Sequence, residues 1–549
     1  MNQSAVKIKL NTGVVLFAIA VLACVLRLYH LDRYPLWFDE SAAALEPRSV
    51  FALPSVTEFF NPEFTRDRAD YLMLYYHGFV FFWRELVGTS VFGLRISSVI
   101  WALLSIGMIY KLASYLYGRN VGLMSAFLLS LAPFHVYYSQ ELRQYTAVMF
   151  LCLISYYLVF RILEFDHPVD WISLIAVNTV IVYFHYIMII LLGAEIILFV
   201  LYRRRIRHAL SKIAGGSFVF LFFVFPVLLI VIQKVAYILT HTVRADISDF
   251  PIWGGKIDFR NVVYTLRNFS IGYTVDFYSW WGWISTCLLV VLCILGVVRG
   301  GEGDSFFTAK RVSAFPYMRE VSLVVLFVFP IASLFIFSQV AKTCYVDRYF
   351  FPLGALYCIA VSAGICSARK SLKIVLMVSV CVCFGAGLAS YYRDDLPRDN
   401  AQHIGYMQKN TRIDEITSAI ARNYRAGDRI MSASRLITLP LKFYMNAYAW
   451  EYPSEKNTRM VCEVNEGKLF WVDNEGNPFV IFYNKIVPTW YDKKPFSDKE
   501  KGTRIWLIHY TFDPRPEVMA DLSKGYEQKA KFLFGDSELY EYEKRLVQR

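Results

Sequence analysis

The sequence predicts an α-helical polytopic membrane protein with about eleven transmembrane helices and a small extracytoplasmic α/β domain at its C-terminus. Of its 549 residues, 56% are hydrophobic and 17% aromatic, whereas an ordinary soluble domain is roughly 45–50% apolar. The mean hydropathy is +0.39. Apolar stretches of about 20 residues, the length that spans a bilayer, recur from residue 11 to residue 391 and then stop. We therefore expect a membrane domain over residues 1–392 and a polar domain over residues 393–549.

Eleven apolar segments are expected to span the membrane, and one further segment is ambiguous. The ambiguous segment, residues 71–87, reads YLMLYYHGFVFFWRELV. Counting it as a span would move every later loop to the opposite side of the membrane. The eleven spans are expected at residues 11–29, 94–116, 121–138, 145–163, 170–184, 186–202, 212–236, 279–299, 320–340, 349–367 and 372–391.

Loop charge decides between the two topologies, because cytoplasmic loops are enriched in Lys and Arg. With segment 71–87 excluded and the N-terminus inside, nearly every basic cluster lies in a cytoplasmic loop. These clusters contain Arg119, Arg161, Arg203, Arg204, Arg205, Arg207, Lys212, Arg299, Lys310, Arg311, Arg319, Arg369, Lys370 and Lys373. Residues 71–87 are then an aromatic juxtamembrane helix at the outer interface. The net charge of +12 is explained by these loops and does not indicate binding to nucleic acid.

Two adjacent acids follow the first span, within the sequence LWFDE (residues 36–40). Carboxylates beside a low-dielectric boundary are candidates for function, so Asp39 and Glu40 are candidate catalytic residues, although two solvated loop acids explain the pattern equally well. Arg143 lies in a second external cluster. Its guanidinium could bind a phosphate in a bidentate manner or simply extend from the interface into water.

Other candidates lie in two further external segments. His185, in the shortest external turn, could donate to a phosphate or a sugar hydroxyl, although a lone His in an aromatic turn is more often structural. The loop before the tenth span contains Lys342, Asp347 and Arg348, and Arg348 could bind phosphate or simply pair with Asp347. Together, the acids offer a base for an acceptor, and the cations offer positive charge to a leaving phosphate. Glu195, inside a span, needs a partner or a proton.

With these residues the chain resembles the GT-C glycosyltransferases, specifically relatives of the protein O-mannosyltransferases and the bacterial aminoarabinose transferases. The resemblance covers the membrane domain. It rests on LWFDE (36–40), YYHGFVFFW (75–83), FGLRISSVI (92–100), LAPFHVYYSQELRQY (131–145) and DRYFFP (347–352). It implies a GT-C fold and an inverting transfer of a sugar from a polyprenyl-phosphate donor to an acceptor hydroxyl, on the extracytoplasmic face of the plasma (inner) membrane.

The same resemblance suggests roles for individual residues. Asp39 corresponds to the general base and Glu40 to a second acid. Donor-phosphate contacts are expected at Arg143, Arg348 and Lys342, and substrate contacts at His185, Tyr145 and Tyr345. The aminoarabinose enzymes carry a Lys-Pro pair ahead of their aromatic segment, where this chain has Arg-Ala-Asp-Tyr at residues 68–71. This difference argues against aminoarabinose as the donor sugar.

The polar domain shows a helical pattern at residues 411–425 and strand-like runs at 429–434, 479–484 and 504–510. Such a domain could contact the acceptor, cap the active site, or only stabilise the protein. The chain has no glycine-rich phosphate loop or nucleotide fingerprint, in keeping with a lipid-linked donor.

The acceptor could be a lipid, a glycan or a protein. Eight of the ten cysteines fall in apolar segments and show no metal-ligand spacing. No cofactor is assigned, although a divalent cation could assist. Cys344 and Cys462 fall in external segments, where a disulfide is chemically permitted. The main alternative function is a polytopic transporter or flippase of a lipid-linked sugar, but the internal repeats typical of transporters are not evident.

Overall fold

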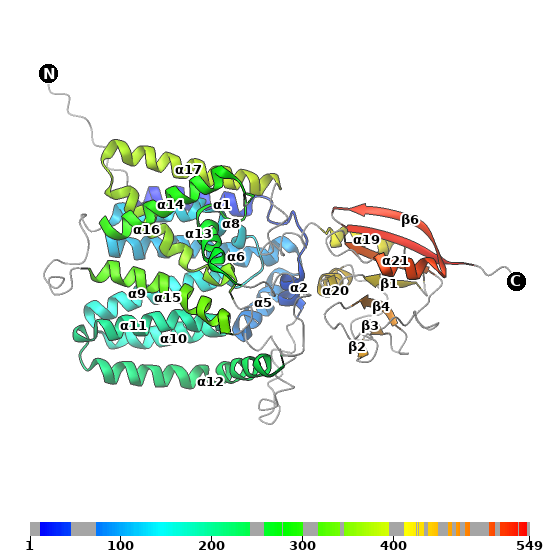
Figure 1. The fold of residues 1–549 in the computed structure, drawn as a ribbon, viewed down its shortest axis with the longest axis horizontal. Helices are drawn as coiled ribbons and strands as arrows, with labels where there is room; N and C mark the ends of the chain where they lie inside the picture. Colours follow the sequence, from blue (N-terminus) through cyan, green and yellow to red (C-terminus); the bar gives the residue numbers. More distant parts are fainter. Residues whose placement is uncertain are drawn as a thin grey trace, which may run out of the picture.

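In the computed structural model, the described residues are 11–45, 73–241, 257–276, 278–299, 317–340, 345–394, 411–423, 425, 428–432, 437–447, 459–463, 468–472, 478–483, 504–510, 516–535 and 537–545. The chain forms a helical body with a sheet-containing domain at one end, where short helix α2 of the body faces helix α20 of the C-terminal domain (Figure 1). Lys342 and Cys344 lie outside the described residues.

Each of the eleven predicted spans coincides with helical structure. In the described part of the chain, six helices are long and apolar enough to cross a membrane, or seven if one bent pair counts as a single span, and four more are shorter apolar helices. The helices are α1 (Thr12–Leu28), α6 (Val91–Tyr117), the bent pair α7 (Arg119–Leu131) and α8 (Pro133–Ser139), α9 (Tyr145–Phe165), α10 (Pro168–Phe184), α11 (Ile189–Leu201), α12 (Ala209–His241), α14 (Trp280–Arg299), α15 (Met318–Val340), α16 (Leu353–Ser367) and α17 (Lys370–Arg393). The prediction of a polytopic helical protein is confirmed.

The predicted span over 121–138 is not a single continuous helix, because α7 and α8 meet at an angle of 60°. Pro133 has no backbone N–H, so the carbonyl of Leu129 loses the donor that a continuous helix would supply. Arg27 of α1, which is completely buried, replaces it: its Nη2 donates to Leu129 O over 3.2 Å and its Nη1 to Ser130 O over 3.0 Å. The first span therefore stabilises the bend.

In the described part of the helical body, three further α-helices lie outside the predicted spans: α2 (Phe38–Leu45), α5 (Leu74–Val87) and α13 (Phe259–Ile271). Helix α5 occupies most of the expected juxtamembrane segment and packs against α2, α6 and α10. Helix α13 lies in segment 237–278, which the sequence analysis expected to be external and where hydropathy gave no sign of a helix. Its start is fixed by a capping box between Asp258 and Asn261, an arrangement that satisfies backbone N–H groups in the first turn.

Glu195 has the partners that its position inside a span requires. Its Oε1 accepts from the Ser155 hydroxyl, and its Oε2 accepts from Asn178 Nδ2 over 2.7 Å. Because the three residues belong to α11, α9 and α10, the cluster links three neighbouring helices.

The C-terminal domain is a mixed α/β structure, as predicted. Its elements are α19 (Ile413–Asn423), β1 (Arg429–Ser432), α20 (Thr438–Ala447), β2 (Arg459–Glu463), β3 (Lys468–Val472), β4 (Pro478–Tyr483), β5 (Arg504–Tyr510), α21 (Pro516–Ser523), β6 (Tyr526–Phe534) and β7 (Ser537–Lys544). The sheet order is β2-β3-β4-β1-β5-β7-β6. Strand β1 is parallel to β4 and β5, and the other pairs are antiparallel. The domain boundary near residue 393 stays a prediction.

Candidate active site

The two adjacent acids of the first loop lie in the first turn of α2 and have different surroundings. Glu40 is completely buried, whereas the side chain of Asp39 is 26% exposed. Successive residues of a helix point about 100° apart, because the helix has 3.6 residues per turn. One acid therefore faces the protein interior while its neighbour is accessible.

Glu40 forms a buried ion pair with Arg95 of α6. Arg95 Nε donates to Glu40 Oε1 over 2.8 Å and Arg95 Nη2 to Oε2 over 2.7 Å. The backbone N–H groups of Leu142 and Trp37 donate to the same carboxylate over 2.7 and 3.3 Å. Arg95 also donates to the carbonyls of Leu31, Tyr34 and Pro35. The pair therefore holds together the segment before α2, α6 and the loop after α8.

Asp39 faces two cations from distant parts of the chain. Its Oδ2 lies 3.6 Å from Arg143 Nη2 and 3.9 Å from Arg348 Nη1. Arg143 belongs to the loop between α8 and α9 and also donates to Asp39 O over 3.1 Å. Arg348 belongs to a short 3₁₀ helix, Asp347–Phe350. Burial lowers the pKa of Arg143 and Asp39 raises it, with a net upward shift, so this guanidinium stays cationic.

Several buried polar atoms beside Arg143 have no hydrogen-bond partner within the described residues: Arg143 Nε, Tyr76 Oη and His185 Nδ1. Burial raises the pKa of the Tyr76 hydroxyl against the effect of the Arg143 charge. Burial, Arg143 and Arg348 together lower the pKa of His185 to about 3, so its imidazole is neutral. Because buried polar groups normally have partners, this cluster is suited to a ligand with several acceptor oxygens, such as a phosphate.

Asp347 and Tyr345 support the site rather than line it. Asp347 is completely buried, and its carboxylate accepts from Tyr273 Oη over 2.8 Å and from Asn268 Nδ2. Burial raises the pKa of Asp347 to about 6 against the effect of these donors. The Tyr345 hydroxyl lies 2.9 Å from that of Thr265 on α13. Both side chains thus fix the 3₁₀ helix that carries Arg348 against α13.

The ring of Tyr145 is buried beside the cations, with its centroid 5.8 Å from the Arg143 guanidinium carbon and 6.0 Å from the ring of His185. The structure therefore brings Asp39, Arg143, Arg348, His185 and Tyr145 together.

The sequence analysis did not identify Arg95 or Tyr76 as residues of the site. Arg95 had a usable signal, since a charged residue near the start of an apolar span calls for a partner.

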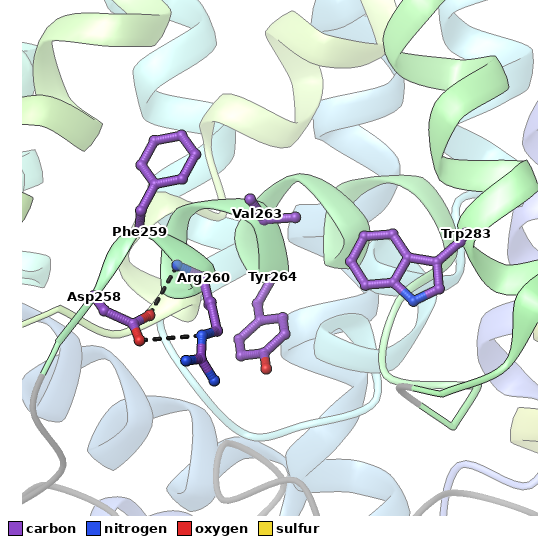
Figure 2. Close-up of a pocket in the computed structure, with 6 residues that line it drawn as sticks. All are labelled: Asp258, Phe259, Arg260, Val263, Tyr264 and Trp283. Atoms are coloured by element: carbon purple, nitrogen blue, oxygen red, sulfur yellow. Dashed lines mark hydrogen bonds and ion pairs between the residues drawn. The ribbon is translucent and has the colours of Figure 1, made fainter.

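A separate recess lies between α13 and α14 and has a volume of about 300 Å³. Figure 2 shows the side chains that line it and an ion pair between Asp258 and Arg260 at one side. Arg260 Nε lies 3.3 Å from Asp258 Oδ2 in this pair. The lining residues are Asp258, Phe259, Arg260, Val263, Tyr264 and Trp283. The ion pair is exposed, and such pairs contribute little to stability.

Within the described residues, no group of three or more His, Cys, Asp or Glu side chains could hold a metal ion.

The chain is similar to known membrane glycosyltransferases in part of its sequence and in its fold. Residues 77–230 match the family model described as dolichyl-phosphate-mannose-protein mannosyltransferase. The structure is similar to that of ArnT from Cupriavidus metallidurans bound to undecaprenyl phosphate, with a TM-score of 0.55 and 10% sequence identity over 96% of this chain and 97% of that chain. The apo form of the same ArnT gives a TM-score of 0.51 with 12% identity over the same shares.

An oligosaccharyltransferase from Archaeoglobus fulgidus is a more distant structural match, with a TM-score of 0.45 and 9% identity over 79% of this chain and 64% of that chain. No curated protein matches the chain.

Proposed function

Because the chain has the fold of the GT-C glycosyltransferases, we propose that it transfers a sugar from a polyprenyl-phosphate donor to an acceptor hydroxyl. The observation that carries the proposal is the position of Asp39, a partly exposed carboxylate within 4 Å of two guanidinium groups. The charges of the loops favour the extracytoplasmic face for this site. The undecaprenyl phosphate bound to the similar protein ArnT is consistent with a donor of this class.

The two guanidinium groups are suited to hold the donor phosphate. Charge-assisted hydrogen bonds between N–H groups and carboxylates measure about 2.7–2.9 Å, so separations of 3.6 and 3.9 Å from Asp39 are too long for them. A phosphate could therefore approach Arg143 and Arg348 without first breaking strong bonds to the Asp39 carboxylate. The buried donor Arg143 Nε and the Tyr76 hydroxyl add further N–H and O–H groups for its oxygens.

In the proposed reaction, Asp39 accepts the proton of the acceptor hydroxyl as the oxygen attacks the anomeric carbon. The new glycosidic bond forms as the bond between the anomeric carbon and the phosphate oxygen breaks. The bonding electrons leave with the polyprenyl phosphate, whose increased charge Arg143 and Arg348 stabilise. A single displacement of this kind inverts the anomeric configuration. Glu40, occupied by Arg95 and two backbone N–H groups, acts as a positioning residue for Asp39.

The test uses purified protein with a panel of polyprenyl-phosphate sugars and hydroxyl acceptors, with products identified by mass spectrometry. Mass spectrometry of carrier lipids and glycoconjugates in cells lacking the protein selects the sugars and acceptors to include. Asp39→Asn keeps the side-chain shape but is a far weaker base. Turnover with the active pair should fall by about 10²–10⁴-fold, while binding of undecaprenyl phosphate is retained.

Two results would contradict the proposal. Near wild-type turnover in Asp39→Asn would remove Asp39 as the base. Movement of a lipid-linked sugar across vesicle membranes, without a covalent product from any donor of the panel, would favour the transporter or flippase alternative.

A further inference from the structure

The C-terminal domain contacts the acid-bearing segment directly. The backbone N–H of Leu36 donates to the hydroxyl of Tyr444 over 2.8 Å, and Leu36 is completely buried while Tyr444 is 6% exposed. Tyr444 lies on α20, which packs against α2 where the two domains meet (Figure 1). A second contact joins the domains at the same place, because Arg412 Nη1 donates to Arg33 O over 3.3 Å.

The hydrogen bond to Tyr444 fixes the start of α2. Leu36 comes two residues before Phe38, the first residue of α2, and its carbonyl accepts from the Ser41 hydroxyl. The N–H of the next residue, Trp37, donates to Glu40, the reciprocal half of a capping box. Asp39 lies in this same turn, so its direction depends on how the turn begins.

The two domains bind different backbone groups of the segment before α2. From the body, Arg95 donates to the carbonyls of Leu31, Tyr34 and Pro35. From the C-terminal domain, Tyr444 accepts from the next backbone N–H group, that of Leu36. Arg95 has no acceptor to offer, since a guanidinium only donates. The Leu36 N–H therefore depends on the C-terminal domain for its partner.

We infer that the C-terminal domain is part of the catalytic apparatus and that Tyr444 is a positioning residue, which orients Asp39 by accepting the hydrogen bond of Leu36. This inference rests on the proposed role of Asp39 as the base. It gives the C-terminal domain a role in turnover, beyond that of a stabilising appendage.

The decisive variant is Tyr444→Phe, which keeps the buried ring and removes only the oxygen that Leu36 needs. Turnover should fall by about tenfold, the effect of one buried hydrogen bond of typical strength, while the affinity for undecaprenyl phosphate stays within about twofold of wild type. In hydrogen-exchange mass spectrometry, peptides covering residues 31–45 should lose protection. Peptides covering β5 should exchange as in wild type.

The matched control is Tyr542→Phe, which removes a hydroxyl from a buried ring on β7 within the apolar cluster of the sheet, away from the acid segment. It should leave turnover and the exchange of residues 31–45 unchanged. A double variant separates positioning from a general loss of stability. If Tyr444 acts through Asp39, adding Tyr444→Phe to Asp39→Asn should cause little further loss, because the two effects are then not additive.

The outcomes distinguish a failure of this inference from a failure of the proposed function. Wild-type turnover in Tyr444→Phe, together with a large loss in Asp39→Asn, would overturn this inference and leave the proposed function intact. Additive losses in the double variant, or equal losses in Tyr444→Phe and Tyr542→Phe, would overturn it as well. Wild-type turnover in Asp39→Asn would overturn the proposed function and, with it, the inference that Tyr444 acts by orienting Asp39.

Discussion

Replacing Glu40 by Gln changes one oxygen of a completely buried carboxylate, and the structure indicates a large cost in stability. Each oxygen accepts from Arg95 and from one backbone N–H group. Whichever of the two oxygens is replaced by the amide NH₂ group, that group would face two hydrogen-bond donors and no acceptor. Arg95, whose side chain is 2% exposed, would also lose its counter-charge. Removing one partner of a buried ion pair costs about 3–5 kcal/mol.

Asp39→Asn is the matched control, because it makes the same chemical change at the neighbouring position. Asp39 is 26% exposed and lies 3.6 and 3.9 Å from its two cations, so its contribution should be close to that of an exposed pair, about 0–1 kcal/mol. We therefore expect opposite results. Glu40→Gln should lower the melting temperature strongly, whereas Asp39→Asn should lower turnover with little effect on melting.

The assay follows thermal unfolding in detergent with a thiol-reactive dye, which reports the exposure of the buried cysteines Cys152 and Cys358. Turnover is measured in parallel at a temperature where each variant is folded. An unchanged melting temperature in Glu40→Gln would show that the Arg95 pair does not stabilise the protein as its geometry implies. Equal melting shifts in both variants would refute the division of roles between the two acids.

Three further predictions concern the cations, pH and topology. Arg143→Lys and Arg348→Lys keep the charge but lose the planar fork that grips phosphate oxygens, so the affinity for undecaprenyl phosphate should fall in titrations at normal protein levels; unchanged affinity in both would exclude them as phosphate ligands. The pKa of His185 is about 3 in the folded protein against about 6.5 when unfolded, so only the unfolded chain gains a proton as pH falls below 6.5, and stability should drop by about 1.4 kcal/mol per pH unit. Melting temperatures at pH 7.5 and 5 should therefore differ less in His185→Gln than in wild type, and equal pH dependence would contradict this. Reporter fusions after Arg205 and after Asp428 should report the cytoplasm and the exterior respectively, and reversed signals would refute the assigned orientation.

The helical body could be predicted from the sequence because span length and apolar content are local properties. An apolar run of about 20 residues predicts a span wherever its neighbours lie, and all eleven predicted segments are helical. The bend at Pro133 was also locally encoded, since proline interrupts a helix. Its stabilisation by Arg27 was not, because that contact joins residues 103 positions apart in the chain.

The difference in burial between Asp39 and Glu40 could not be predicted from the motif LWFDE. Adjacent residues on a helix face different directions, and the acid that is buried, Glu40, is the one that pairs with Arg95. Arg95 is 55 residues away from Glu40 in the chain, and Tyr444 is 408 residues away from Leu36. Such contacts depend on the packing of whole helices and of a second domain, which a local pattern does not record.

The arginines near the site differ in how closely their N–H groups approach acceptors, and this difference agrees with the proposed role of Arg143 and Arg348 in binding phosphate. Arg27 and Arg95 donate to carbonyls and to the Glu40 carboxylate over distances of hydrogen-bond length. Arg143 and Arg348 instead lie 3.6 and 3.9 Å from Asp39. A phosphate could bind to Arg27 or Arg95 only by breaking bonds that hold α1, α2 and α6 in place. At Arg143 and Arg348 it would displace the long contacts with the Asp39 carboxylate, and that displacement would leave the carboxylate free to accept a proton from the acceptor hydroxyl.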